Sequence, residues 1–131
     1  MSSESSPMPV SKAQLWTGRV LSALPVLLLL MSGVMKLAKP APVLEGFVRL
    51  GYPVGVIAPL GFVELACTAL YLIPRTSVLG AILLTGYLGG ATATHVRAGE
   101  PFYGAVLTGV LVWGGLFFRE LRLRELIPLR K

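Results

Sequence analysis

Four long apolar stretches dominate the hydrophobic pattern of the chain, at residues 15–35, 54–73, 78–94 and 103–118. Charged residues and prolines stand between these stretches, and few charges lie inside them. As an α-helix the first stretch would extend about 31 Å, which matches the hydrocarbon thickness of a bilayer. The fourth has 16 residues and is slightly short, a mismatch that local thinning of the bilayer accommodates. The pattern predicts four transmembrane helices.

Between the first two stretches the pattern becomes amphipathic and is interrupted by prolines. Glu45 and Arg49 fall on one face of a helix through this segment. The opposite face carries apolar or small residues, namely Leu44, Phe47, Val48 and Gly51. A short helix of this kind lies in the membrane interface rather than across the membrane. We therefore predict an all-α fold: an integral membrane four-helix bundle with a short interfacial helix between spans one and two.

The same pattern divides the chain into three regions. Residues 1–12 are rich in serine and proline without a period, and we expect a disordered N-terminal tail there. Residues 13–118 form the transmembrane domain. Residues 119–131 combine arginines with leucines, and we expect a basic cytoplasmic tail that lies on anionic headgroups.

Composition and charge support the membrane interpretation. Of the 131 residues, 54% are hydrophobic and 14% charged, an apolar excess that excludes a disordered chain and argues against a soluble globule. The net charge of +6 does not indicate nucleic-acid binding, because the basic residues border the apolar stretches instead of clustering with aromatic residues. We expect the lipid bilayer, and not a nucleic acid, to be the partner of these charges.

The distribution of lysine and arginine also predicts the topology. Alternating spans place eight basic residues on one side: Lys12, Arg19, Arg75, Arg119, Arg122, Arg124, Arg130 and Lys131. The other side receives four: Lys36, Lys39, Arg49 and Arg97. The richer side is expected to be cytoplasmic, so both termini should face the cytoplasm.

Glu64 is the most unusual residue for a membrane location, because it falls near the middle of the second span. An ionised carboxylate there costs several kcal/mol unless it faces the interior of the helices and finds a partner. The alternating helix directions bring the end of span one, the start of span two and the end of span three to the outer side. We therefore expect Lys36, Glu64, His95 and Arg97 to gather there as a ligand-binding or proton-relay cluster. The alternative is an interhelical polar clamp that only fixes packing.

Other polar and small residues extend this picture along the helices. The expected polar lining of the site comprises Ser32, Cys67, Thr68, Tyr71, Thr92 and Thr94. Gly86 and Gly90 form a GxxxG pair, which favours helix packing within the chain or in a homodimer. The single cysteine and single histidine exclude a disulfide, a CxxC redox pair and a His-rich metal site. No catalytic constellation is present, so we expect no catalytic residues, no metal and no enzyme activity by the chain alone.

Several segments resemble the DoxX-like family of small four-helix membrane proteins. The similarity is carried by SGVMKLAKP (Ser32–Pro40), by GYP (Gly51–Pro53) and by the long segment from Glu64 to Pro101 that includes GGATATH. The family-type positions are Gly33, Lys36, Glu64, Pro74, Arg75, Gly80, Thr94 and His95. The resemblance implies four transmembrane helices in the bacterial inner membrane. It also implies an association with membrane redox or oxidative-stress complexes, since the family takes its name from a subunit linked to thiosulfate:quinone oxidoreductase and a quinol oxidase.

Three functions are compatible with these observations. The first is an accessory protein that holds a quinone or similar lipid near Glu64 and His95 for membrane redox subunits; the quinone is the cofactor this expectation names. The second is a proton-linked transporter of a small molecule in which Glu64 acts as a gate. The third is a structural assembly factor without a ligand.

Overall fold

The computed structural model describes residues 11–130, and all regular structure in that range is helical. The helices are α1 (Lys12–Ala38), α2 (Ala41–Arg49), α3 (Ile57–Leu72), α4 (Ser77–Ala98), α5 (Tyr103–Arg119) and α6 (Leu121–Arg124). Short 3-10 turns, Val54–Val56 and Pro74–Thr76, lead into α3 and α4. The all-α prediction is confirmed for this range. The expected N-terminal tail falls largely outside the described residues.

Local capping makes α1 longer than the predicted 15–35 span. The Ser11 hydroxyl accepts a hydrogen bond from the Gln14 backbone N–H at 3.2 Å and begins the helix at Lys12. At the other end Lys39 adopts a left-handed conformation with φ 54°, and its N–H donates to Met35 O. Pro25 is accommodated in the middle of the helix.

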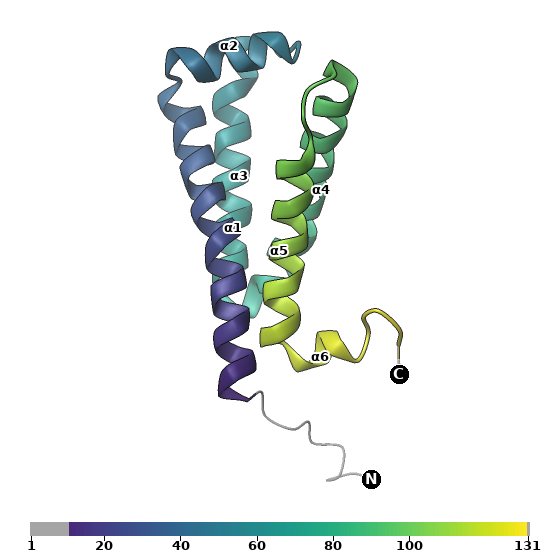
Figure 1. Cartoon of the computed structure of the whole chain (residues 1–131). Helices are drawn as coiled ribbons and strands as arrows, with labels where there is room; N and C mark the ends of the chain where they lie inside the picture. Colours follow the sequence, from purple (N-terminus) through teal and green to yellow (C-terminus); the bar gives the residue numbers. More distant parts are fainter. Residues whose placement is uncertain (1–10, 131) are drawn as a thin grey trace.

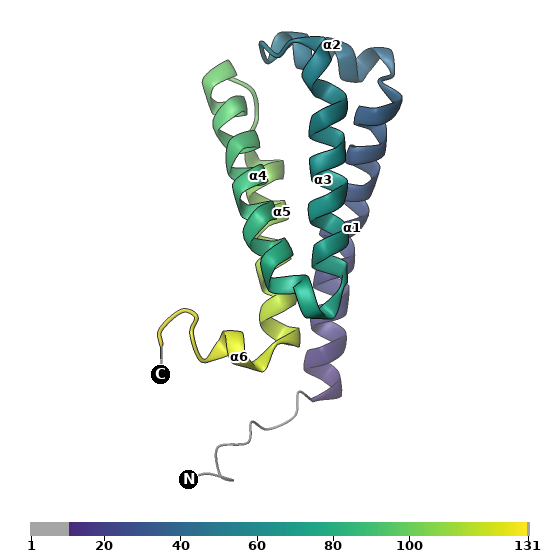
Figure 2. The ribbon, with the colours of Figure 1, turned by 180° about the vertical axis from the view of Figure 1, so that it is seen from behind.

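The four long helices pack side by side in a closed ring of contacts. Helix α1 contacts α3 and α5, and α4 contacts α3 and α5. Figure 1 shows the α1–α3 pair and the α4–α5 pair close together near α6 and separated near α2. The view from behind in Figure 2 shows the same splay, with α2 lying across the ends of α1 and α3. We call the two ends of the molecule the α6 half and the α2 half.

Burial follows this asymmetry. The buried core of the α6 half contains Val26, Leu29, Tyr71, Ala81, Leu84, Val112 and Leu116. Between Leu88 near the middle of α4 and Thr108 in α5, by contrast, no residue is buried. The α2 half retains buried positions only where α1 and α3 pack on each other, at Gly33, Ile57 and Gly61.

Glycines set the close helix contacts. A Cβ at Gly61 would lie 3.0 Å from Gly33 O, so this pair brings α1 and α3 together. A Cβ at Gly115 would lie 2.8 Å from Ser22 N, so a glycine also allows the close contact between α5 and α1. The expected packing pair, Gly86 and Gly90, has no neighbour within 4 Å in the described chain. Intrachain packing therefore does not use these two glycines, and a role in a homodimer stays a prediction.

Three helical segments are long and apolar enough to cross a membrane, namely Lys12–Ala38, Val54–Leu72 and Pro74–Ala98. The fourth long helix, α5, is a shorter apolar helix of 17 residues. The amphipathic segment between the first two is helical, as predicted, and forms α2.

Candidate functional site

Glu64 lies in the interior, between three of the long helices. Its side chain is 1% exposed although it belongs to an apolar helix. Its Oε1 atom accepts hydrogen bonds from Lys36 Nζ at 2.7 Å and from Tyr87 Oη at 2.7 Å. Ser32 Oγ donates to the same oxygen at 3.3 Å. We call these four residues the Glu64 cluster.

Helix geometry explains how the cluster is assembled. Ser32 and Lys36 are four residues apart on α1 and therefore share a face, and Lys36 Nζ donates to Ser32 Oγ at 2.6 Å. The Gly33–Gly61 contact lets α1 approach α3 closely enough for that face to reach Glu64. Tyr87 reaches the carboxylate from α4, so the cluster joins the two helix pairs.

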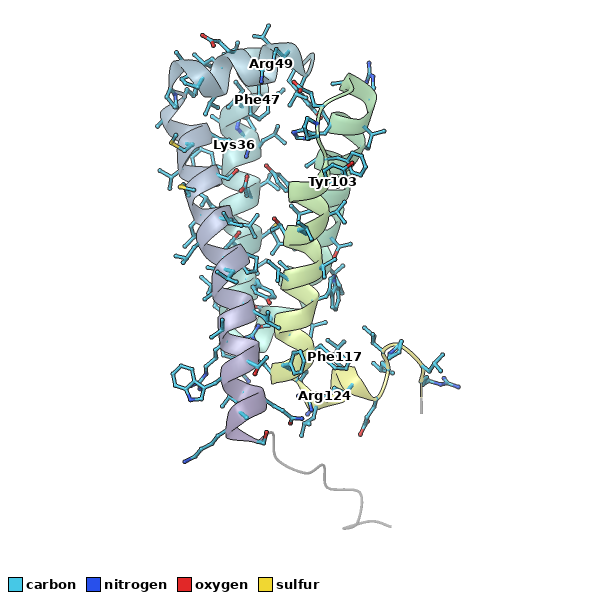
Figure 3. The ribbon with its side chains drawn as sticks, in the orientation of Figure 1. Lys36, Phe47, Arg49, Tyr103, Phe117 and Arg124 are labelled. Carbon is cyan, nitrogen blue, oxygen red and sulfur yellow. The ribbon has the colours of Figure 1, made fainter. Side chains whose placement is uncertain are left out.

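Lys36 is covered from above by α2. Its ammonium lies 5.9 Å from the ring centroid of Phe47 in α2 and 5.9 Å from that of Tyr87. Figure 3 shows Lys36 just below Phe47 at the α2 end of the helices. The side chain is only 14% exposed, so the ion pair with Glu64 is largely removed from solvent. The two aromatic rings favour the cation at this position.

The electrostatics of the cluster leave one acceptor free. A buried ion pair is tolerated only when both charges are well hydrogen-bonded, and here three donors converge on Oε1. Within the described residues no donor reaches Oε2 of the same carboxylate. A carboxylate offers about four lone-pair sites, so Oε2 can accept a hydrogen bond from a ligand.

The expected cluster of four charged groups is only half assembled. His95 Nδ1 lies 2.7 Å from Ala91 O of its own helix, and within residues 11–130 neither His95 nor Arg97 pairs with Glu64. The reason is the rise of α4. His95 stands eight residues beyond Tyr87, which is about 12 Å along the axis, and Arg97 is farther still. Both residues lie toward the α2 end without contacting Glu64, and a role for them in ligand binding or proton relay stays a prediction.

Arg97 instead lines a small polar pocket at the α2 end. The pocket has a volume of about 130 Å3 and is also lined by Leu50, Gly51, Tyr52 and Thr94. Tyr52 and Thr94 are hydrogen-bonded through their hydroxyls at 2.8 Å. This bond is one of the few links between the connection after α2 and the end of α4. A surface ion pair from Arg49 Nε to Glu100 Oε1, at 3.2 Å, links α2 itself to the segment after α4.

The expected polar lining of α3 separates into two environments. Thr68 donates to the Glu64 backbone carbonyl at 2.7 Å, and Cys67 is buried beside it. Tyr71 lies deeper in the α6 half, where its hydroxyl donates to Val112 O at 2.6 Å and lies 3.0 Å from Ser22 Oγ. Thr92 bonds to Leu88 O in its own helix and lines an outer groove instead of the cluster.

The sequence analysis missed Tyr87 and Tyr52. A tyrosine in the middle of an apolar span carries a hydroxyl that must find a partner, and this was an available signal for Tyr87. Tyr52 stands in the GYP segment that carries the family resemblance, but nothing in the sequence indicated that Thr94 would be its partner. No three His, Cys, Asp or Glu side chains gather as a metal site anywhere in residues 11–130.

The fold and the cluster together define a small all-helical protein with membrane-length apolar helices and a buried lysine–glutamate pair between them. The sequence model of the DoxX-like family matches residues 20–117, which is most of the chain. The protein therefore belongs to the DoxX-like family. Comparison with curated proteins found no match, and comparison with solved structures found none either.

Proposed function

We propose that this protein is an integral membrane four-helix bundle of the bacterial cytoplasmic membrane, with both termini in the cytoplasm. The three long apolar segments and the shorter α5 supply the spans. The eight basic residues on the side of the termini, against four on the other side, support this orientation. The α2 half then belongs to the outer leaflet.

Within that membrane the protein holds a quinone or a similar carbonyl-bearing lipid at the Glu64 cluster, as an accessory component of a redox or oxidative-stress complex. The observation that carries this proposal is the buried ion pair between Glu64, in the middle of α3, and Lys36, in the last turn of α1. Ionisable groups buried within apolar spans mark functional sites. The Lys36 ammonium donates to Ser32 and Glu64, which leaves its third N–H for a carbonyl oxygen. The Oε2 atom of Glu64 can accept a hydrogen bond from a quinol hydroxyl.

The packing around the cluster favours binding over transport. Above the cluster, no residue between Leu88 in α4 and Thr108 in α5 is buried, so the two helix pairs are not packed together there. Below it, Leu29, Leu84 and Val112 are each at most 3% exposed and form a dry layer. A proton-linked transporter would need a route through this layer, so the arrangement supports a site with access from one side.

The test compares wild type with Glu64→Gln and with Glu45→Gln, a matched control on the exposed face of α2. Each protein is purified in mild detergent, and co-purifying quinones and lipids are quantified by mass spectrometry. We expect nearly one quinone per wild-type chain and the same for Glu45→Gln. Glu64→Gln should retain about tenfold less or lower still, because a hydrogen bond to a charged group is lost.

Two outcomes would contradict the proposal. If wild type carried no quinone or carbonyl-bearing lipid, the proposed ligand would be wrong. A ligand retained equally by Glu64→Gln, together with a lower unfolding temperature of that variant, would identify the cluster as an interhelical clamp in a structural assembly factor.

A further inference from the structure

An open apolar groove of about 600 Å3 runs along the α4–α5 pair, and none of its lining residues belongs to the Glu64 cluster. The groove is hollow because small residues stand on both helices, Gly89 on α4 and Gly109 and Gly114 on α5. A Cβ built at Gly89 would meet no atom within 4 Å. The hollow therefore opens outward and is not filled by the chain itself.

The polar groups in the groove are already satisfied. Trp113 Nε1 donates to Thr85 Oγ1 at 2.7 Å, and that hydroxyl donates to Ala81 O at 2.7 Å. Thr92 Oγ1 donates to Leu88 O at 2.8 Å. What the groove offers a ligand is an apolar surface, which fits a hydrocarbon chain and not a polar molecule.

A basic group stands at the α6 end of the groove. Ile127 lines that end, and Arg124 lies three residues before it. Arg124 donates from Nε to Phe117 O at 2.9 Å and from Nη2 to Phe118 O at 2.8 Å, so it caps the end of α5. A guanidinium has five N–H donors, and these two bonds leave others for an anion. Figure 3 shows Phe117 and Arg124 together at this end of the molecule.

We propose that the groove binds one acyl chain of an anionic phospholipid, with the lipid phosphate at Arg124. From Ala105 to Phe117 the groove follows α5 for about 18 Å, a length suited to an acyl chain. The basic end lies on the cytoplasmic side, the leaflet that carries the anionic lipids. This inference rests on the membrane location proposed above but not on any ligand at Glu64.

The apolar part of the site is tested with a pair of glycine variants of the full chain. Gly89→Leu places a side chain in the groove, whereas Gly86→Leu, one turn earlier on α4, is equally exposed and lies outside it. Native mass spectrometry is used to titrate phosphatidylglycerol and phosphatidylcholine with identical acyl chains. Gly89→Leu should weaken binding of both lipids about tenfold or more, since two methylene groups left unburied account for that factor. Gly86→Leu should bind as wild type does.

The charged part is tested at Arg124. Wild type should prefer phosphatidylglycerol over phosphatidylcholine about fivefold, the factor expected for one basic group near the membrane surface. Arg124→Gln should lose this preference. Arg124→Lys should keep most of it, although a lysine cannot make both hydrogen bonds of the guanidinium to the end of α5. Circular dichroism of each variant establishes that the helices are retained.

Equal lipid binding by Gly89→Leu and Gly86→Leu would overturn the proposal. So would a change from dimer to monomer in Gly89→Leu alone, because the groove would then be an interface between two copies of the chain. Loss of quinone at Glu64 without any change in phosphatidylglycerol binding would affect only the function proposed above.

Discussion

Toward α6 the four long helices share one core of buried side chains, whereas toward α2 the α4–α5 pair separates from the α1–α3 pair. The α6 half is held by apolar packing around Leu29, Leu84 and Val112, each at most 3% exposed. In the α2 half the link between the pairs is polar, through Tyr87 on Glu64 and through Tyr52 on Thr94. One end of the molecule is thus specified by packing and the other by a few hydrogen bonds.

The Glu64 cluster stands at the boundary between these two regions. The packed half lies below Glu64, and on the other side Phe47 of α2 covers Lys36, its ion-pair partner. Interhelical hydrogen bonds in membranes contribute modestly, about 0.6 kcal/mol on average. In the α2 half, therefore, the distance between the α1–α3 pair and the α4–α5 pair can change at a small cost in free energy.

Breaking the ion pair should have the largest effect on stability. Lys36→Met leaves the Glu64 carboxylate buried without its cation, and we expect a loss of about 3–5 kcal/mol in the free energy of unfolding. The double variant Lys36→Met/Glu64→Leu should recover most of this loss, because an apolar pair needs no desolvation. Thermal unfolding followed by circular dichroism in detergent measures both. If Lys36→Met were as stable as wild type, the Lys36–Glu64 ion pair would not contribute to holding α1 and α3 together.

A second prediction contrasts two glycines of α4, one in each region. A Cβ at Gly80 would lie 2.6 Å from Tyr71 Cα, so Gly80→Ala must displace backbone and should cost about 1–3 kcal/mol. A Cβ at Gly90 would meet nothing within 4 Å, so Gly90→Ala should stabilise the helix by about 0.5–1 kcal/mol. The buried thiol of Cys67 reports unfolding when its reaction with a maleimide is followed during heating. If Gly80→Ala and Gly90→Ala changed the unfolding temperature by the same amount and in the same direction, the two halves would not differ in packing.

The smallest effect is expected at the surface link of the α2 half. Arg49→Gln removes the ion pair to Glu100, in which the arginine side chain is 66% exposed. The change in unfolding free energy should stay below about 1 kcal/mol and should vanish in high salt. Unfolding temperatures at low and high ionic strength provide the comparison. A loss as large as that of Lys36→Met would mean that this surface pair contributes as much to stability as the buried one.

Much of the fold could be predicted from the periodicity of apolar residues. The long helices and the short amphipathic α2 fall where the pattern placed them, because helix formation depends mainly on local sequence. The ends of α1 were less accurate, since Ser11 and Lys39 extend it by capping geometry that hydropathy does not record. The pairing of Lys36 with Glu64 could be anticipated from alternating helix directions. The choice of Tyr87 as third partner could not, because it depends on the rotation of α4 about its own axis.

The sequence by itself determined that the chain is helical and apolar and that it carries one carboxylate, Glu64, inside an apolar helix. These properties follow from residue type and from spacing along a single helix. Only the tertiary structure decided which glycines bring helices together, that His95 and Arg97 stand too far along α4 to reach Glu64, and that few side chains are buried in the α2 half. Such features depend on how neighbouring helices are rotated and spaced, and that arrangement is set by contacts between residues far apart in the chain.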